Sequence, residues 1–130
     1  MKCLDSNFLI DFLRNESKAV KMASKFENES ICSTSINIFE VLFGIQLMKE
    51  KEERIEKFKQ FIKTFDILLF DLESIERASE IAAELVKQRK DASANDCLIA
   101  GTMIAHGCNS IVSNDFEHFD KIKGIKVERY

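Results

Sequence analysis

Short apolar runs alternate with longer helix-like segments along the whole chain, and this alternation constrains the fold more than any other feature. Each run has the length and composition of a buried strand. The expected strands are 2–5, 30–33, 67–70, 110–113 and 125–128. The expected helices are one beginning at Ser6 or Asn7 and the segments 16–27, 35–47, 55–65, 72–90, 94–107 and 116–122. Such alternation indicates α/β architecture: a three-layer α/β/α sandwich around a mostly parallel sheet of about five short strands.

The length of 130 residues suits one domain, 1–130, since no repeat or linker interrupts the pattern and proline is absent. A formal net charge of −3 disfavours a generally basic nucleic-acid binder. Asp5 and Asp11 interrupt the first apolar segment, which argues against a signal peptide. The longest apolar run, 36–48, is too short to cross a bilayer and contains Glu40. We therefore expect a cytoplasmic protein with no membrane partner.

The cysteines lack CxxC spacing and lie mostly inside apolar segments, so buried reduced thiols are expected. They are Cys3, Cys32, Cys97 and Cys108. A zinc site that combines Cys97 and Cys108 with His106 and His118 is a weaker alternative. Both histidines are expected to be structural or to lie on the surface.

Four acids occur where a carboxylate is costly. Asp5 ends the first expected strand, and Asp115 follows the fourth. Glu40 and Asp96 lie in two very apolar helical segments. A buried carboxylate must be neutralised, paired or metal-bound. Since ligands of parallel sheets bind beyond the carboxyl ends of the strands, we expect these acids to lie close together at that edge.

Each acid alone has a simpler interpretation. Ser93 and Asp96 match a capping box, and this segment by itself favours a capping role for Asp96. Asp5 could cap the first helix, Asp115 could be a turn residue, and Glu40 could lie on a thin polar stripe. As a set without matching lysines or arginines in these segments, however, the acids suit a hard cation such as Mg²⁺ or Mn²⁺, which serves phosphoryl chemistry.

Four segments, in order, resemble the motifs of PIN domains. They are "LDSNFLIDFL" at 4–13, "STSINIFEVLFG" at 33–44, "ANDCLIAGTMIAHG" at 94–107 and "IVSNDFEHFDKIKGIKVE" at 111–128. The short chain most resembles the VapC-type toxins of toxin–antitoxin pairs. Serines at 6 and 113 replace the commoner threonines and keep the hydroxyl group.

The resemblance implies a magnesium-dependent endoribonuclease that needs no side-chain nucleophile, with Mn²⁺ as an alternative metal. The implied catalytic and metal-ligand set is Asp5, Glu40, Asp96 and Asp115. The implied orienting residues are Asn7, Ser113 and Asn114. Glu117 is a rival for Asp115, because some relatives carry the fourth acid further on. Asp11 matches no motif position and is expected to face solvent.

Large apolar side chains crowd the helices expected between 35 and 65, and a groove between them would suit a partner helix. The resemblance implies that a VapB-type antitoxin binds there and that the chain forms a homodimer with RNA as substrate. We hypothesise that the antitoxin inserts a basic residue towards the carboxylates. Candidates for holding RNA backbone are Arg14, Lys87, Arg89 and Lys90, although a solvated helix end is the simpler interpretation of the last three.

Other functions fit parts of the pattern. A PIN nuclease could act in RNA processing outside a toxin–antitoxin pair, or an inactive PIN domain could serve as a scaffold. A receiver-like signalling domain would need a phosphoacceptor, for which Asp71 is the candidate, and a lysine opposite it that no strand supplies. A phosphotransferase with an aspartate nucleophile would need a second Asp two residues after Asp5, where the chain has Asn7.

Overall fold

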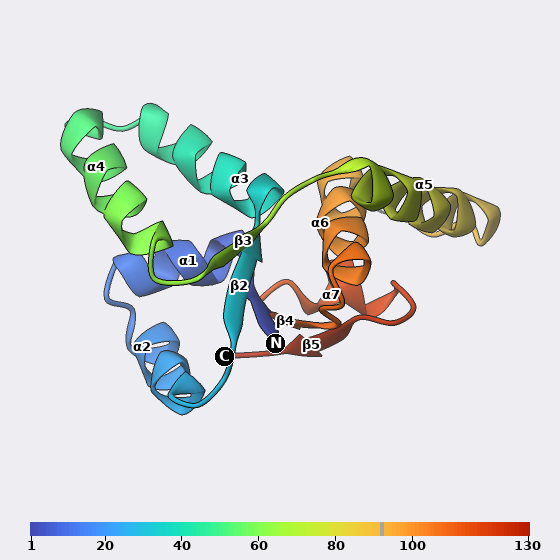
Figure 1. Ribbon diagram of the computed structural model, residues 1–130, viewed down its shortest axis with the longest axis horizontal. Helices are drawn as coiled ribbons and strands as arrows, with labels where there is room; N and C mark the ends of the chain where they lie inside the picture. Colours follow the sequence, from blue (N-terminus) through green and yellow to red (C-terminus); the bar gives the residue numbers. More distant parts are fainter. Residues whose placement is uncertain (92) are drawn as a thin grey trace.

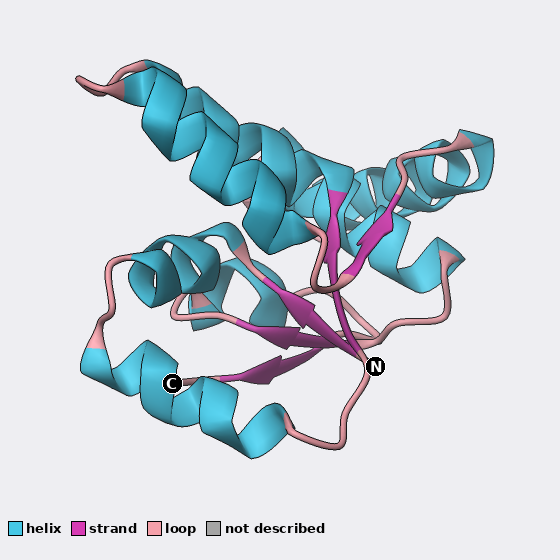
Figure 2. Ribbon diagram, turned by 60° about the vertical axis from the view of Figure 1, so that its left-hand side comes forward, coloured by secondary structure: helices cyan, strands magenta, loops and turns pink. Residues whose placement is uncertain are grey.

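The structure is a computed structural model that describes residues 1–91 and 93–130. Its five strands form one sheet in the order β3-β2-β1-β4-β5, and every pairing is parallel (Figure 2). The strands are β1 (Lys2–Leu4), β2 (Ile31–Thr34), β3 (Asp66–Leu68), β4 (Ser110–Val112) and β5 (Lys126–Glu128). The predicted strands are all present, within one or two residues of their expected bounds.

Helices cover both faces of this sheet, as Figure 1 shows. One face carries α1 (Ser6–Leu13), α2 (Ser17–Ala23), α3 (Ser35–Gln46) and α4 (Lys51–Ile62). The other carries α5 (Leu72–Lys87), α6 (Ala94–Ala105) and α7 (Phe116–Asp120). The predicted three-layer α/β/α architecture is confirmed. No helix in the described part of the chain is long and apolar enough to span a membrane.

Alternation along the central strands builds two separate cores. In β1, Cys3 packs towards α5–α7 whereas Leu4 packs towards α1–α4. In β4, Ile111 and Val112 divide in the same way. Successive strand residues point to opposite faces, and because helices cover both faces, these four residues of the two strands are all apolar and buried. All four cysteines are buried free thiols, as the apolar context predicted.

Several helices differ from the expected bounds. α4 begins at Lys51 rather than at residue 55, so it includes most of the charged segment 49–54, and α5 ends at Lys87 rather than at residue 90. Glu52 and Glu53 fall in the first turn of α4, where negative charge is favoured by the helix dipole. The segment 16–27 breaks into α2 and a 3₁₀ turn, Ser24–Phe26.

The carboxyl ends of the strands run directly into polar residues. Asp5 links β1 to α1, and Thr34 at the end of β2 caps α3. Ser113 and Asp115 lie in the short connection between β4 and α7. Because β1 lies at the centre of the sheet, its carboxyl end is flanked by the ends of β2 and β4. One edge of the sheet therefore gathers polar groups from several distant parts of the sequence.

Gly101 allows α5 and α6 to pack closely, since a Cβ atom there would lie 2.4 Å from the backbone nitrogen of Ala78. Gly101→Ala is expected to destabilise the protein by about 1–3 kcal/mol through overpacking, measured by chemical denaturation. Gly44→Ala in α3 is the matched control, because its Cβ would meet no atom within 4 Å and alanine favours the helix. Equal stability of the two variants would contradict the close packing of α5 on α6.

Candidate active site

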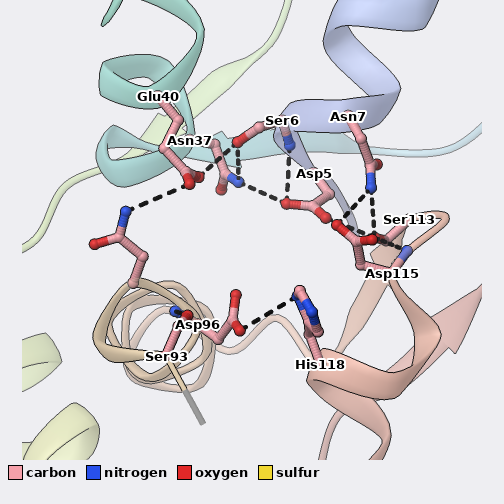
Figure 3. A network of polar contacts seen from close by, with 11 residues as sticks. Asp5, Ser6, Asn7, Asn37, Glu40, Ser93, Asp96, Ser113, Asp115 and His118 are labelled. Atoms are coloured by element: carbon pink, nitrogen blue, oxygen red, sulfur yellow. Dashed lines mark hydrogen bonds and ion pairs between the residues drawn. The ribbon is translucent and has the colours of Figure 1, made fainter.

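An open pocket of about 370 Å³ lies at this carboxyl edge. Its lining residues are Asp5, Ser6, Asn7, Glu40, Ser93, Ala94, Asn95, Asp96, Ile99, Asp115 and His118. Figure 3 shows the acids of the set facing a common space from α3, α6 and the segments that follow β1 and β4. The structure thus brings together the four acids that the sequence singled out.

Asp5 is the most buried of these acids, with 5% of its surface exposed. Its Oδ1 accepts hydrogen bonds from the Ser6 backbone N–H (2.8 Å) and from Asn37 Nδ2 (2.9 Å). Its Oδ2 accepts one from Ser113 Oγ (2.5 Å). Burial nevertheless raises the pKa of Asp5 to about 6, and the negative charges of Glu40 and Asp115 add to the rise. The uncharged donors therefore hold the Asp5 carboxylate in position but do not balance its negative charge.

Glu40 reaches the pocket from α3 and is held by a chain of side chains. Ser6 Oγ donates to Glu40 Oε1 (2.7 Å), while Asn37 Nδ2 donates to Ser6 Oγ (3.0 Å). Asn95 Nδ2 lies 3.4 Å from Glu40 Oε2. Since Asn37 also donates to Asp5, this one amide fixes the relative positions of two acids.

Asp96 shows that capping and site roles belong to different atoms of one residue. Its backbone N–H donates to Ser93 Oγ (3.1 Å), which is the cap predicted from the sequence. Its carboxylate oxygen Oδ2 instead lies 3.5 Å from His118 Nδ1 across the pocket (Figure 3). Ser93 is thus the cap, as expected, whereas the Asp96 carboxylate has no hydrogen bond to the Ser93 backbone among the described residues and faces the pocket.

Asp115 is exposed at the pocket mouth and is tied to α1. Asn7 Nδ2 donates to Asp115 Oδ2 (3.0 Å) and to Ser113 Oγ (3.3 Å). The Asp115 backbone N–H donates to the same hydroxyl (2.9 Å). Among the described lining residues, Glu117 and Asn114 belong to a neighbouring pocket and not to this one. The geometry thus favours Asp115 over Glu117 as a companion of Asp5.

Some residues of the site were missed from the sequence. Asn37 is completely buried, and its position three residues before Glu40 on one helix face was the available signal. His118 is exposed, in agreement with a surface position, but the sequence did not indicate that it lines the pocket beside Asp96. Asp11, expected to face solvent, is partly buried and accepts a hydrogen bond from the Tyr130 hydroxyl (2.6 Å).

The donor chemistry fits a hard divalent cation. The acids offer oxygen ligands, and no lysine or arginine occurs among the described residues that line the pocket. Within the described chain, no three acid, histidine or cysteine side chains already converge as a set of metal ligands. An open arrangement suits Mg²⁺, which keeps several waters when it binds to proteins.

Comparison with known proteins places this geometry among related chains. The family model of the PIN domain matches residues 2–125. The tRNA(fMet)-specific endonuclease VapC of Shigella flexneri is 25% identical over 125 residues, which cover 96% of this chain and 94% of that protein. Ribonuclease VapC1 of Rickettsia felis is 33% identical over 95 residues, which cover 71% of this chain and 70% of that protein.

Solved structures share the fold over nearly the whole length. VapBC2 from Rickettsia felis, bound to a DNA fragment from its promoter, matches with a TM-score of 0.88 and 23% identity, covering 99% of this chain and 98% of that one. DNA-bound VapBC from Salmonella typhimurium matches with a TM-score of 0.87 and 24% identity, covering 98% and 96%. These likenesses agree with the α/β architecture predicted from the sequence.

Asp5→Asn is expected to stabilise the metal-free protein at pH 8 by about 1–3 kcal/mol. The folded-state pKa of Asp5, about 6, exceeds the unfolded value, so ionised Asp5 destabilises the fold above pH 6. This difference should shrink as the pH falls through 6 and vanish near pH 4. Thermal unfolding in EDTA at several pH values measures it.

Added Mg²⁺ should then raise the unfolding temperature of the unsubstituted protein but not that of Asp5→Asn, because only the former keeps the carboxylate that is expected to bind the ion. Asp120→Asn, an exposed acid on α7 outside the pocket lining, is the control. This account of Asp5 would be contradicted if Asp5→Asn were less stable than the unsubstituted protein at pH 8. It would also be contradicted if Mg²⁺ raised the unfolding temperature of Asp5→Asn as much as that of the unsubstituted protein.

Proposed function

We propose that this chain, which belongs to the PIN-domain family, is a Mg²⁺-dependent endoribonuclease and the toxin of a VapBC-type pair. The family membership predicted from the sequence is confirmed, and relatives across the length of the chain are named ribonucleases. The substrate is RNA, and the reaction is hydrolysis of a phosphodiester bond.

One observation carries this proposal: four carboxylates line a single open pocket whose described lining holds no lysine or arginine. Such a cluster would repel itself and a polyanion unless cations offset its charge. The residues that would hold Mg²⁺, or Mn²⁺ in its place, are Asp5, Glu40, Asp96 and Asp115. When bound, the ion supplies Lewis acidity and offsets negative charge on the phosphate.

The protein's own contribution is to hold these oxygen atoms in place. Asn37 and Ser6 couple Asp5 to Glu40, so the two carboxylates keep a fixed relation. Ser113 orients the other oxygen of Asp5, and Asn7 joins this hydroxyl to Asp115. Preorganised ligands of this kind need little rearrangement when substrate arrives. Asn7 and Ser113 thus act through the acids as orienting residues.

His118 places an imidazole ring beside one of the four acids. Its Nδ1 lies 3.5 Å from Asp96, so a protonated imidazole would pair with that carboxylate and a neutral one could donate to it. Either arrangement would orient Asp96 within the pocket. We assign His118 this positioning role.

Asp96→Asn is expected to lower metal-dependent cleavage of labelled RNA by about 100-fold or more, because it removes a ligand and its charge. The assay runs with Mg²⁺ and with EDTA, and unfolding curves verify the fold. Asp120→Asn, which removes an acid of the same helix as His118 outside the pocket lining, should cleave normally. Full activity of a folded Asp96→Asn protein would refute the ligand assignment.

The same assay decides the fourth acid. Asp115→Asn should lose activity and Glu117→Gln should retain it, because only Asp115 shares the pocket with Asp5 among the described lining. Loss of activity in Glu117→Gln alone would transfer the role to Glu117.

We further propose that a VapB-type antitoxin occupies the apolar groove between α1, α3 and α4. Its lining includes Ile10, Val41, Ile45, Met48 and Phe58, and its rim carries Arg14, Arg54 and Lys57. A helix with apolar anchors and acidic flanks would complement it. Arg14, a candidate RNA contact from the sequence, is among the residues that line this groove. A basic residue of the same antitoxin would reach the carboxylates.

A homodimer is the proposed use of a second apolar surface on α3. Phe39 and Phe43 are 61% and 58% exposed, with ring centroids 6.1 Å apart, and Leu47 continues the stripe one turn on. These positions recur every four residues and so lie on one helix face. Contiguous exposed apolar surface of this kind marks protein contacts.

Phe43→Glu is expected to convert the dimer to a monomer in light scattering at micromolar concentration, because the charge would be buried in the interface. Val86→Glu, at an exposed apolar residue near the end of α5, is the control and should remain dimeric. Met48→Glu should leave the dimer intact, but it should abolish copurification with a coexpressed VapB-type antitoxin, because Met48 lines the proposed antitoxin groove. A monomeric unsubstituted protein would contradict the dimer.

A further inference from the structure

A second pocket of about 400 Å³ adjoins the carboxylate pocket. The two pockets share Asp115 and His118 and are therefore contiguous, so a chain-like ligand can extend from one into the other. Its remaining lining comes from the β4–α7 connection, α7 and the residues that follow β5: Asn114, Phe116, Glu117, Arg129 and Tyr130. Apart from the shared Asp115 and His118, no residue of this second pocket has a part in the proposed hydrolysis.

Arg129 is the one lysine or arginine among the described residues that line either pocket. Its guanidinium carbon lies 4.1 Å from the ring centroid of Phe116. This side chain is exposed and forms no ion pair within the described chain. A cation held against an aromatic face without a carboxylate partner remains available to an anionic ligand.

The sheet itself brings Arg129 to the site. The Ser113 backbone N–H donates to Glu128 O (3.0 Å), which keeps the end of β5 level with the end of β4. Arg129 follows directly and therefore lies beside the connection that carries Asp115. An arginine far along the sequence thus joins the edge of the sheet where Asp5 ends β1.

The charge pattern indicates what this arginine meets. Asp115 and Glu117 line the same pocket and repel a polyanion, whereas Arg129 offers several N–H donors in a planar fork that matches phosphate oxygens. Single-stranded RNA also offers bases that stack on aromatic rings and guanidinium planes. A pocket that combines Arg129 with Phe116 and Tyr130 has both kinds of group.

We propose that this second pocket binds the nucleotide adjacent to the scissile phosphate, with Arg129 donating to its backbone phosphate. Phe116 is a positioning residue that restricts the guanidinium to the orientation in which it faces the pocket. Asn114, a polar residue of the last sequence motif, lines this pocket and contributes hydrogen-bonding groups to the same nucleotide. This inference rests on the proposed ribonuclease function and adds a binding site for the RNA chain just outside the carboxylate pocket.

The test measures binding separately from cleavage. A short fluorescein-labelled single-stranded RNA with phosphorothioate linkages, which resist hydrolysis, is titrated with the unsubstituted protein in Mg²⁺, and anisotropy is followed at several salt concentrations. Arg129→Gln is expected to weaken binding about tenfold and to reduce the slope of log Kd against log salt by about 0.7, the value for one phosphate contact on a single strand. Lys25→Gln removes an equal charge from the 3₁₀ turn before β2, at the opposite edge of the sheet, and should change neither quantity.

Phe116→Leu keeps an apolar side chain but removes the ring. We expect it to weaken binding less than Arg129→Gln and to add nothing when combined with it, because Phe116 acts through Arg129. Additive losses would overturn the positioning role. Binding of RNA at the second pocket would be rejected if Arg129→Gln had the same affinity and salt slope as Lys25→Gln. It would also be rejected if the protein with Arg129 unchanged did not bind the RNA.

The outcomes also separate this pocket from the ribonuclease proposal. Cleavage that Asp96→Asn abolishes, together with an unchanged KM for Arg129→Gln, would leave the ribonuclease standing and reject the pocket. Cleavage unaffected by Asp96→Asn, together with weakened binding by Arg129→Gln, would reject the carboxylate mechanism and retain an RNA contact at Arg129. A raised KM with unchanged kcat for Arg129→Gln is the result expected if both hold.

Discussion

The burial of the Asp5 carboxylate at the end of the central strand is the constraint on which the rest of the site depends. A carboxylate at this depth needs donors, and they come from three elements: Ser6 at the start of α1, Asn37 of α3 and Ser113 after β4. Each donor is also bonded to a second acid or to a group that touches one. The positions of Glu40 and Asp115 are therefore tied to that of Asp5.

These contacts satisfy the hydrogen bonds of the acid without removing its charge. The pKa of Asp5 rises to about 6 because burial and the charges of Glu40 and Asp115 outweigh the donated hydrogen bonds. The folded protein thus holds mutually repelling carboxylates at one edge of the sheet, and a divalent cation can reduce that repulsion. Stability given up in this way is typical of binding sites, where the ligand restores what the isolated protein lacks.

The two helical layers serve different purposes around this edge. On one face, α5 and α6 pack closely at Gly101 and hold Asp96 over the pocket from the first turn of α6. On the other, α3 places Glu40 in the pocket while turning Phe39 and Phe43 outward. One helix can thus present an acid to the pocket and apolar side chains to solvent at once, because neighbouring residues lie about 100° apart around its axis.

The sequence by itself determined the α/β class, the approximate positions of the five strands and the four acids that meet in the pocket. These follow from local signals: apolar periodicity, and carboxylates in segments too apolar to leave them unpaired. Tertiary structure alone decided how the acids are held. Asn37, His118 and Arg129 gained their places through contacts with residues 32, 22 and 13 positions away, in Asp5, Asp96 and Phe116. Periodicity reports the face on which a residue lies, whereas the partner it meets depends on how parallel strands align the ends of distant segments.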